Sequence, residues 1–157
     1  MIPIKVLVPS GVLGLGFDLE ALNNGVKNNP DIISIDGGST DSGPYSLGSG
    51  TSKYSRAAIK AEWKSLMIAR KKANVPLVIG SCGTCGTNRM VDWMENITIE
   101  LAEELNQNIK IAKLYCQQEK NFIKKNLQLR KIFPLNPAPM LNSQLIEEMT
   151  NIVALAG

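Results

Sequence analysis

The sequence predicts an α/β fold, a parallel, Rossmann-like three-layer sheet with helices on both of its faces. Apolar runs of strand length alternate along the chain with segments of helical periodicity. The strand-like runs are apolar at successive positions, which is typical of parallel strands that are covered on both faces. With 157 residues, of which 44% are hydrophobic and 20% charged, residues 1–157 are predicted to form one domain.

Four strands are predicted from the apolar runs. They cover residues 4–9, 31–36, 75–80 and 109–115. Turn-forming residues end the first two runs, Ser10-Gly11 after the first and Gly37-Gly38 after the second. Parallel strands need crossover connections, and the intervening segments are long enough to contain helices.

Helices are predicted in the segments between and after these strands. Asp18 and Ser55 are suitable N-caps for the first two helices, and Asn28-Asn29-Pro30 ends the first. Apolar residues spaced to lie on one helix face identify the second and third helices: Ile59, Trp63, Leu66 and Met67, then Met90, Trp93, Met94, Ile97, Leu101 and Leu105. The last two helices are predicted over residues 119–129 and 143–154.

Candidate functional residues follow the predicted strands. The carboxyl ends of parallel strands lie at one edge of the sheet, where ligands bind in this class of fold. Those ends carry Ser10-Gly11, Asp36-Gly37-Gly38, Ser81-Cys82 and Cys116-Gln117. We therefore expect the ligand site at this edge.

The first loop, residues 9–18, is glycine-rich and lies between a strand and a helix. Ser10 and Gly11 are predicted to bind substrate, because glycine lets the backbone approach a ligand and a helix N-terminus favours an anion. The spacing departs from the G-x-G-x-x-G pattern of dinucleotide sites, and the only acidic residue at the end of the second strand is Asp36. Carboxylate or other anion binding, dinucleotide binding and a purely structural turn all remain open.

The second loop, residues 36–52, is rich in glycine, serine and threonine. Asp36 and Asp41 are candidate catalytic residues, as acid and base, or ligands of a divalent cation, and Tyr45 is a candidate proton donor. The predicted substrate-binding residues of this loop are Gly38, Ser39 and Thr40. A loop of this length in a compact domain is uncommon without a function. In the structural alternative, the aspartates stabilise turns and the Tyr45 ring packs over the glycines.

The third loop contains Cys82 and Cys85 at the start of a helix, where the helix dipole lowers thiol pKa values. Together with Cys116, they provide the three thiolates that a [4Fe–4S] cluster with one open iron needs in a dehydratase. Zinc is not expected, because a fourth ligand is missing. A reactive thiol pair and small buried side chains are the alternatives. Beside the cysteines, Ser81 is predicted to bind substrate, and Arg89 to clamp a carboxylate or phosphate.

The composition excludes several classes of function. The chain has no histidine, so Ser-His-Asp and Cys-His nucleophiles and histidine-ligated zinc are excluded within it. No apolar stretch has the length of a membrane span and no signal peptide precedes the first strand, so a cytoplasmic protein without membrane contact is expected. Basic residues gather in residues 110–131, but aromatic residues are sparse there, and no nucleic-acid partner is expected.

Two stretches of the chain carry a resemblance to a known family. Residues 9–17, Pro-Ser-Gly-Val-Leu-Gly-Leu-Gly-Phe, and residues 36–52, which begin Asp-Gly-Gly-Ser-Thr-Asp-Ser-Gly-Pro-Tyr, resemble the N-terminal region of the acyclic terpene utilisation AtuA family. Ile79-Gly80-Ser81, followed by glycines, is similar to a third signature of that family. The resemblance implies an α/β fold and a role in the breakdown of small carboxylic acids or acyl-CoA compounds.

The resemblance also bears on the partners and the cysteines. Members of the family usually continue with further α/β structure, which implies that this chain is one half of a split or longer protein. A second protein chain or a homo-oligomer is therefore expected. The family usually has small residues at the positions of Cys82 and Cys85, so a cluster here would belong to a subgroup.

These observations predict a subunit of an enzyme of small carboxylic acid or acyl-CoA catabolism, of the lyase or hydratase type. Its substrate would bind at the glycine-rich carboxyl edge of the sheet, with the three-cysteine cluster as cofactor. Two alternatives stay open. One is a non-catalytic ligand-binding or regulatory subunit that uses the same loops, and the other is a dinucleotide-dependent oxidoreductase.

Overall fold

The computed structural model describes residues 3–9, 11–38 and 44–154 of the chain. It confirms an α/β fold built on a parallel sheet. In the described residues the sheet has three strands, β1 (Val6–Leu7), β2 (Ile32–Asp36) and β3 (Leu77–Gly80), in the order β1-β2-β3. Val6 lies opposite Ile32 in the register of this sheet, and Asp36 lies opposite Gly80.

Six helices are found in the same residues. They are α1 (Leu19–Lys27), α2 (Tyr45–Ser49), α3 (Arg56–Ala73), α4 (Asn88–Glu104), α5 (Lys120–Gln128) and α6 (Ser143–Glu148). The predicted N-caps are confirmed: the Asp18 carboxylate accepts hydrogen bonds from the backbone of Glu20 and Ala21, and the Ser55 hydroxyl accepts one from Ala58. Of the helices found here, none combines the length and the hydropathy needed to span a bilayer.

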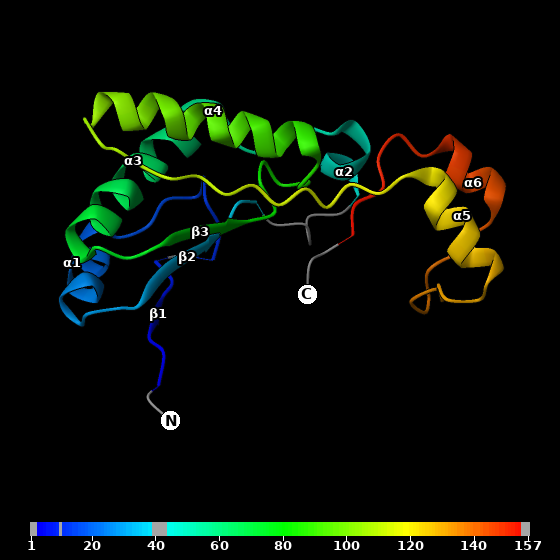
Figure 1. The fold of residues 1–157 in the computed structure, drawn as a ribbon, viewed down its shortest axis with the longest axis horizontal. Helices are drawn as coiled ribbons and strands as arrows, with labels where there is room; N and C mark the ends of the chain where they lie inside the picture. Colours follow the sequence, from blue (N-terminus) through cyan, green and yellow to red (C-terminus); the bar gives the residue numbers. More distant parts are fainter. Residues whose placement is uncertain (1–2, 10, 39–43, 155–157) are drawn as a thin grey trace.

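The hydrophobic core lies between one face of the sheet and helices α1, α3 and α4 (Figure 1). Ile33 and Ile35 project from β2 into this core and are buried, because alternate side chains of a strand point to the same face. The helices contribute the predicted apolar positions: Leu22 and Val26 from α1, Ile59, Trp63, Leu66 and Met67 from α3, and Met94, Ile97 and Leu101 from α4. The Trp63 indole N–H donates to the Thr98 hydroxyl at 3.0 Å, which ties α3 to α4.

The opposite face of the sheet is exposed. We define this open sheet face by the side chains of Ile4, Val6, Val8, Ile32, Ser34 and Val78. The exposed fractions are 77% for Ile4, 56% for Val6, 58% for Val8 and 44% for Val78. The second layer of helices that the sequence predicts is therefore not seen among the described residues. Parallel sheets are normally covered on both faces, whereas this apolar face is open in the described residues.

The prediction of a fourth strand over residues 109–115 is wrong. No strand is assigned in residues 105–119, and β3 is the last strand of the sheet. The segment instead lies along α4: the Lys113 ammonium donates to Asp92 at 3.0 Å and to Glu95 at 2.6 Å, and the Tyr115 hydroxyl donates to Asp92. Side-chain contacts with α4 thus hold a segment whose backbone has no strand partner.

Residues 116–154 form an arm that projects from the body and carries α5 and α6 (Figure 1). The two ends of the arm pair with each other in a neck, where Gln118 N–H donates to Ile152 C=O at 2.7 Å and Ala154 N–H donates to Cys116 C=O at 2.9 Å. The predicted last helix, residues 143–154, is therefore too long: it ends at Glu148, because residues 152–154 are engaged in this pairing.

Candidate functional site

The carboxyl ends of β2 and β3 lie side by side, as predicted for a parallel sheet. Asp36 is the register partner of Gly80, and Gly37 N–H donates to Gly80 C=O at 2.6 Å. Thr84 N–H donates to Gly37 C=O at 3.3 Å, and Leu13 N–H of the first loop donates to Asp36 C=O at 2.8 Å. Backbone hydrogen bonds therefore join all three predicted loops at one edge of the sheet.

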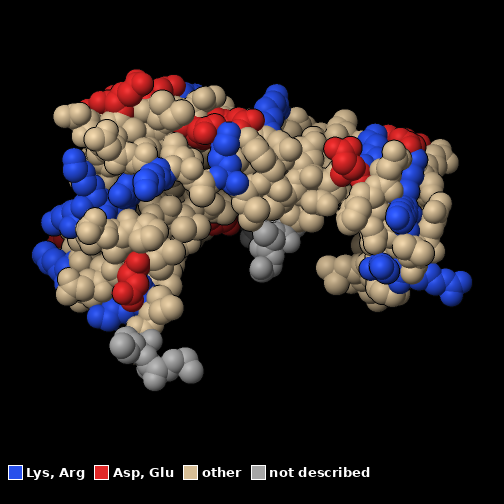
Figure 2. Space-filling model, in the orientation of Figure 1, with Lys and Arg blue, Asp and Glu red and all other residues tan. Residues whose placement is uncertain are grey.

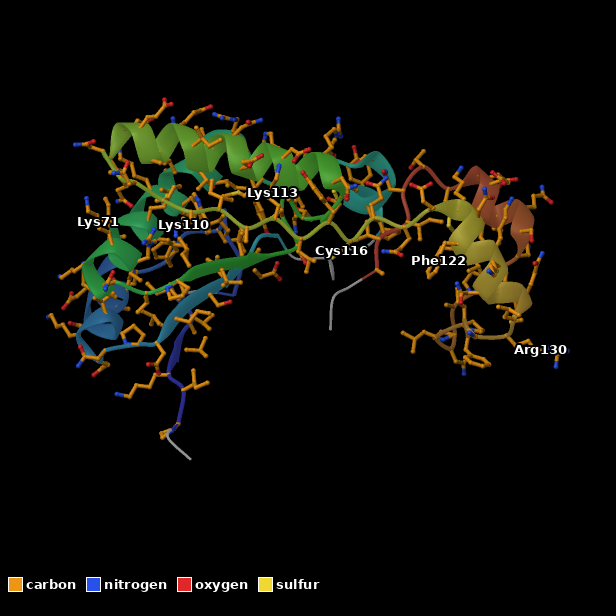
Figure 3. The ribbon with its side chains drawn as sticks, viewed as in Figure 1. Lys71, Lys110, Lys113, Cys116, Phe122 and Arg130 are labelled. Atoms are coloured by element: carbon orange, nitrogen blue, oxygen red, sulfur yellow. The ribbon has the colours of Figure 1, made fainter. Side chains whose placement is uncertain are left out.

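The neck of the arm lies at the same edge. A Cβ added to Gly86 would lie 3.7 Å from Ser81 Cα and 3.9 Å from Val153 Cγ1. Val153 pairs with Gln117, the neighbour of Cys116. Figure 3 shows Cys116 on the chain segment that leads from the body to the arm. The ends of β2 and β3 and the segment around Cys116 are thus connected by direct contacts.

The first loop already binds a carboxylate, and that carboxylate belongs to the protein. Gly14 N–H and Gly16 N–H each donate to the Glu62 side chain at 2.7 Å. The N-terminus of α1 is likewise occupied by the Asp18 carboxylate. The amides that would bind the pyrophosphate of a dinucleotide are therefore already paired. Gly11 is exposed, with no atom within 4 Å of an added Cβ, and Ser10 lies outside the described residues.

In the second loop, Asp36 is exposed, and its Oδ1 accepts a hydrogen bond from Gly38 N–H at 2.9 Å. Since Ile33 and Ile35 face the core, strand alternation places Asp36 on the open side of the sheet. Tyr45 is the first residue of α2 and is 80% exposed, so its ring does not pack over the glycines. The predicted site residues Ser39, Thr40 and Asp41 lie outside the described residues.

Gly38 and Thr84 make the closest approach between two of these loops. A Cβ on Gly38 would lie 2.4 Å from Thr84 Oγ1 and 2.5 Å from Thr84 Cα. Thr84 itself is 1% exposed, and its Oγ1 accepts a hydrogen bond from Lys53 N–H at 3.0 Å. The absence of a side chain at Gly38 thus serves loop packing. The sequence analysis missed Thr84; a β-branched residue between glycines was its only signal.

The backbone of the third loop is strained. Ser81 has φ +47° and Thr84 has φ +71°. Residues other than glycine rarely adopt these values, and a β-branched residue at positive φ is a clear outlier. Such residues cost on the order of 1–3 kcal/mol each and are found mainly at functional sites, where the surrounding structure imposes the conformation. At Thr84 two hydrogen bonds hold this conformation: its N–H donates to Gly37 C=O, and its hydroxyl oxygen accepts from Lys53 N–H.

The pKa of the Cys82 thiol differs from what the sequence predicts. Burial raises the pKa of the Cys82 thiol to about 11, so the lowering expected from the helix N-terminus is wrong for this residue. Cys85 is 5% exposed, and its Sγ lies 3.5 Å from the Thr87 hydroxyl. No group of three Cys, His, Asp or Glu residues in the described part of the chain could hold a metal ion. The cluster expected at Cys82, Cys85 and Cys116 stays a prediction.

Arg89 lies at the start of α4, where its guanidinium donates to Gly50 C=O. Gly50 is the C-cap of α2, with φ +65°. The Asn151 side chain lies beside the same glycine, within 3.4 Å of an added Cβ. Arg89 therefore links α2 to α4, and the segment that follows α6 lies beside the same glycine.

Two hollows of the described surface are lined by residues other than those at the ends of β2 and β3. One, of about 450 Å³, lies at the base of the arm between Gln117, Lys120, Glu147 and Thr150. Another, of about 470 Å³, lies between the end of α4 and residues 106–111.

The chain was compared with family models, with curated proteins and with solved structures, and none of them matches it. No family is therefore assigned.

Proposed function

We propose that this chain is a subunit of an enzyme of small carboxylic acid or acyl-CoA catabolism, of the lyase or hydratase type. Its ligand would bind at the carboxyl edge of β2 and β3. One observation supports this most directly: an exposed carboxylate, Asp36, lies beside a loop in which Ser81 and Thr84 are held in strained conformations. The resemblance to the AtuA family supports the substrate class.

The proposal gives the residues of this edge separate tasks. Asp36 is the candidate base, since an exposed carboxylate can accept a proton from a carbon or a water next to a bound substrate. The third loop would bind the substrate through Ser81, and Arg89 would bind its carboxylate or phosphate. The first loop has a supporting task, because Glu62 already occupies the amides of Gly14 and Gly16.

The remaining parts of the prediction are separate proposals. In the three-layer, Rossmann-like arrangement, the second layer of helices would come from a partner chain. The three-cysteine cluster stays a prediction to which no step of the reaction is assigned. Iron and sulfide analysis of protein purified without oxygen tests it.

The experiment is a binding and turnover assay with a pair of matched variants. Asp36→Asn removes the carboxylate at the carboxyl end of β2, and Asp31→Asn removes one directly before its amino end. Calorimetric titration with acetyl-CoA and with short-chain saturated and unsaturated carboxylates would measure affinity. We expect a dissociation constant in the micromolar to millimolar range, at least about 10-fold weaker binding for Asp36→Asn and no change for Asp31→Asn.

Hydration of the unsaturated acids can be monitored through the loss of their ultraviolet absorption. This assay distinguishes an enzyme from a non-catalytic binding subunit. Turnover that falls in Asp36→Asn supports the enzyme, whereas binding without turnover supports the alternative of a regulatory subunit. Equal effects of both variants, or no binding of any of these compounds, would contradict a site at this edge.

A further inference from the structure

Two apolar surfaces of the described chain are exposed to solvent. One is the open sheet face. The other is the arm, on which large apolar side chains have exposed fractions of 57% for Phe122, 54% for Leu129, 78% for Phe133, 85% for Leu135 and 72% for Met140. α5 has no buried residue, and in the described residues α6 has one, Ile146. Apolar surfaces of this kind are rare on monomeric soluble proteins and mark interaction sites.

The arm cannot cover the sheet face of its own chain in this arrangement. Its neck is anchored at the carboxyl edge, where Asn88 N–H donates to Gln117 Oε1 at 3.2 Å and the Thr150 hydroxyl donates to Gly48 C=O at 3.0 Å. From this anchor the arm points away from the strands (Figure 1). The neck hydrogen bonds of Gln118 and Ala154 would have to break before α5 could reach the open sheet face.

The charges of the two surfaces are complementary. Lys120 and Lys124 of α5 pair with Glu147. Lys125, Arg130 and Lys131 form no ion pair in the described residues, and Figure 2 shows basic side chains toward the far end of the arm, where Figure 3 places Arg130. On the open side of the sheet, the carboxylate of Asp36 at the carboxyl end of β2 is exposed and forms no ion pair in the described residues.

We propose that two copies of this chain associate by exchanging arms, so that the arm of each copy covers the open sheet face of the other. The exchange buries the apolar side chains of both surfaces and brings Lys125, Arg130 and Lys131 of the arm toward the Asp36 carboxylate at the carboxyl end of β2. The contact between an arm and a sheet face occurs twice in a closed, two-fold dimer. Stable complexes bury roughly 1,200–2,000 Å² in total, and a reciprocal exchange contributes two arm–face contacts to that area.

Sedimentation equilibrium of the full chain and of three variants tests this proposal. Val6→Lys places a charge on the open sheet face, and Phe133→Glu places one on the arm. Each is expected to weaken the dimer by about 100-fold or more, as at central interface positions. Ile68→Lys, at a residue of α3 that is 49% exposed, is the matched control and should leave the dimer unchanged. Far-UV circular dichroism checks that all variants keep the native fold.

A mixing experiment distinguishes arm exchange from contact between two sheet faces. In a mixture of Val6→Lys and Phe133→Glu chains, the intact arm of the first can still bind the intact face of the second. We expect association in the mixture that neither variant shows alone. A wild-type monomer at about 100 μM, a dimer that Phe133→Glu leaves intact, an open-ended polymer, or a mixture that stays monomeric would each overturn the proposal. A monomer would indicate that a different protein covers this face.

Discussion

The carboxylate of Glu62, on α3, accepts a hydrogen bond of 2.7 Å from the backbone N–H of Gly14, in the loop after β1. Its second oxygen accepts one of the same length from Gly16. One side chain thus fills the position in which this glycine loop would otherwise bind an anion. The loop is held against α3, and the candidate ligand site moves to the second and third loops.

Replacement of Glu62 should destabilise the fold by removing both hydrogen bonds. Hydrogen bonds to charged groups contribute roughly 1.5–3 kcal/mol each, and the two share one side chain, so Glu62→Ala should lower the free energy of unfolding by about 2–4 kcal/mol. Glu62→Gln should cost about half as much, because its amide nitrogen cannot accept a hydrogen bond. Urea denaturation measures both.

Glu103→Ala is the control for this prediction, since Glu103 is exposed on α4 and forms no ion pair in the described residues. It should change the free energy of unfolding by less than about 0.5 kcal/mol. A Glu62→Ala variant as stable as Glu103→Ala would show that the loop does not depend on this carboxylate.

Gly38→Ala should disrupt the contact between the second and third loops. The added Cβ would lie 2.6 Å from the backbone nitrogen of Thr84, a backbone atom that cannot move without shifting the loop. We expect a loss of more than about 3 kcal/mol in the free energy of unfolding. Gly48→Ala is the matched control, because nothing lies within 4 Å of an added Cβ there; if thermal melting shows equal losses for both, the close approach is not required.

The raised pKa of Cys82 predicts a loss of stability at high pH. The thiol has an ordinary pKa of 9.0 and a folded-state pKa of about 11. Between these values the unfolded chain releases the proton and the folded chain keeps it, so the free energy of unfolding falls as pH rises from about 9 to about 11. Two pKa units correspond to about 2–3 kcal/mol.

The measurement compares the pH dependence of unfolding for the wild type and for Cys82→Ala. The variant lacks this thiol, so the stability difference between the two proteins should shrink over that pH range. Parallel pH profiles would mean that Cys82 is not buried in the folded protein. Rapid reaction of the Cys82 thiol with iodoacetamide at pH 8 would mean the same.

The helices that the sequence predicts correctly are those whose signals are local. Asp18 and Ser55 cap α1 and α3 through hydrogen bonds to residues two or three positions further along the chain. The spacing of Ile59, Trp63 and Leu66 likewise depends only on the period of the helix, and these residues are buried. Such features can be read directly from a short window of sequence.

The errors come from segments whose structure depends on distant parts of the chain. Residues 109–115 are apolar enough for a strand, but a strand exists only where another strand pairs with it, and Lys113 binds α4 instead. The last helix ends early because residues 152–154 pair with residues 116–118. Glu62 and Gly14 are 48 residues apart in the sequence, and no local sequence pattern predicts their contact.

The sequence predicts the location of the candidate site, but not the contacts within it. The rule that parallel strands end at one edge placed Asp36 beside Gly80 and Ser81 correctly. It could not show that Thr84 would fill the space next to Gly38, since that depends on the backbone conformation of both loops. Nor could it show that burial would raise the pKa of the Cys82 thiol.

We expect a small carboxylate or an acyl-CoA compound to bind where the second and third loops meet. Backbone amide chemical shifts of isotope-labelled protein, titrated with acetyl-CoA and with short-chain carboxylates, test it most directly. The largest changes are expected at Gly37, Gly38, Ser81 and Gly83. Smaller ones are expected at Gly14 and Gly16, whose amides already donate to Glu62. Changes confined to the arm or to the far end of α4, or no changes at all, would contradict it.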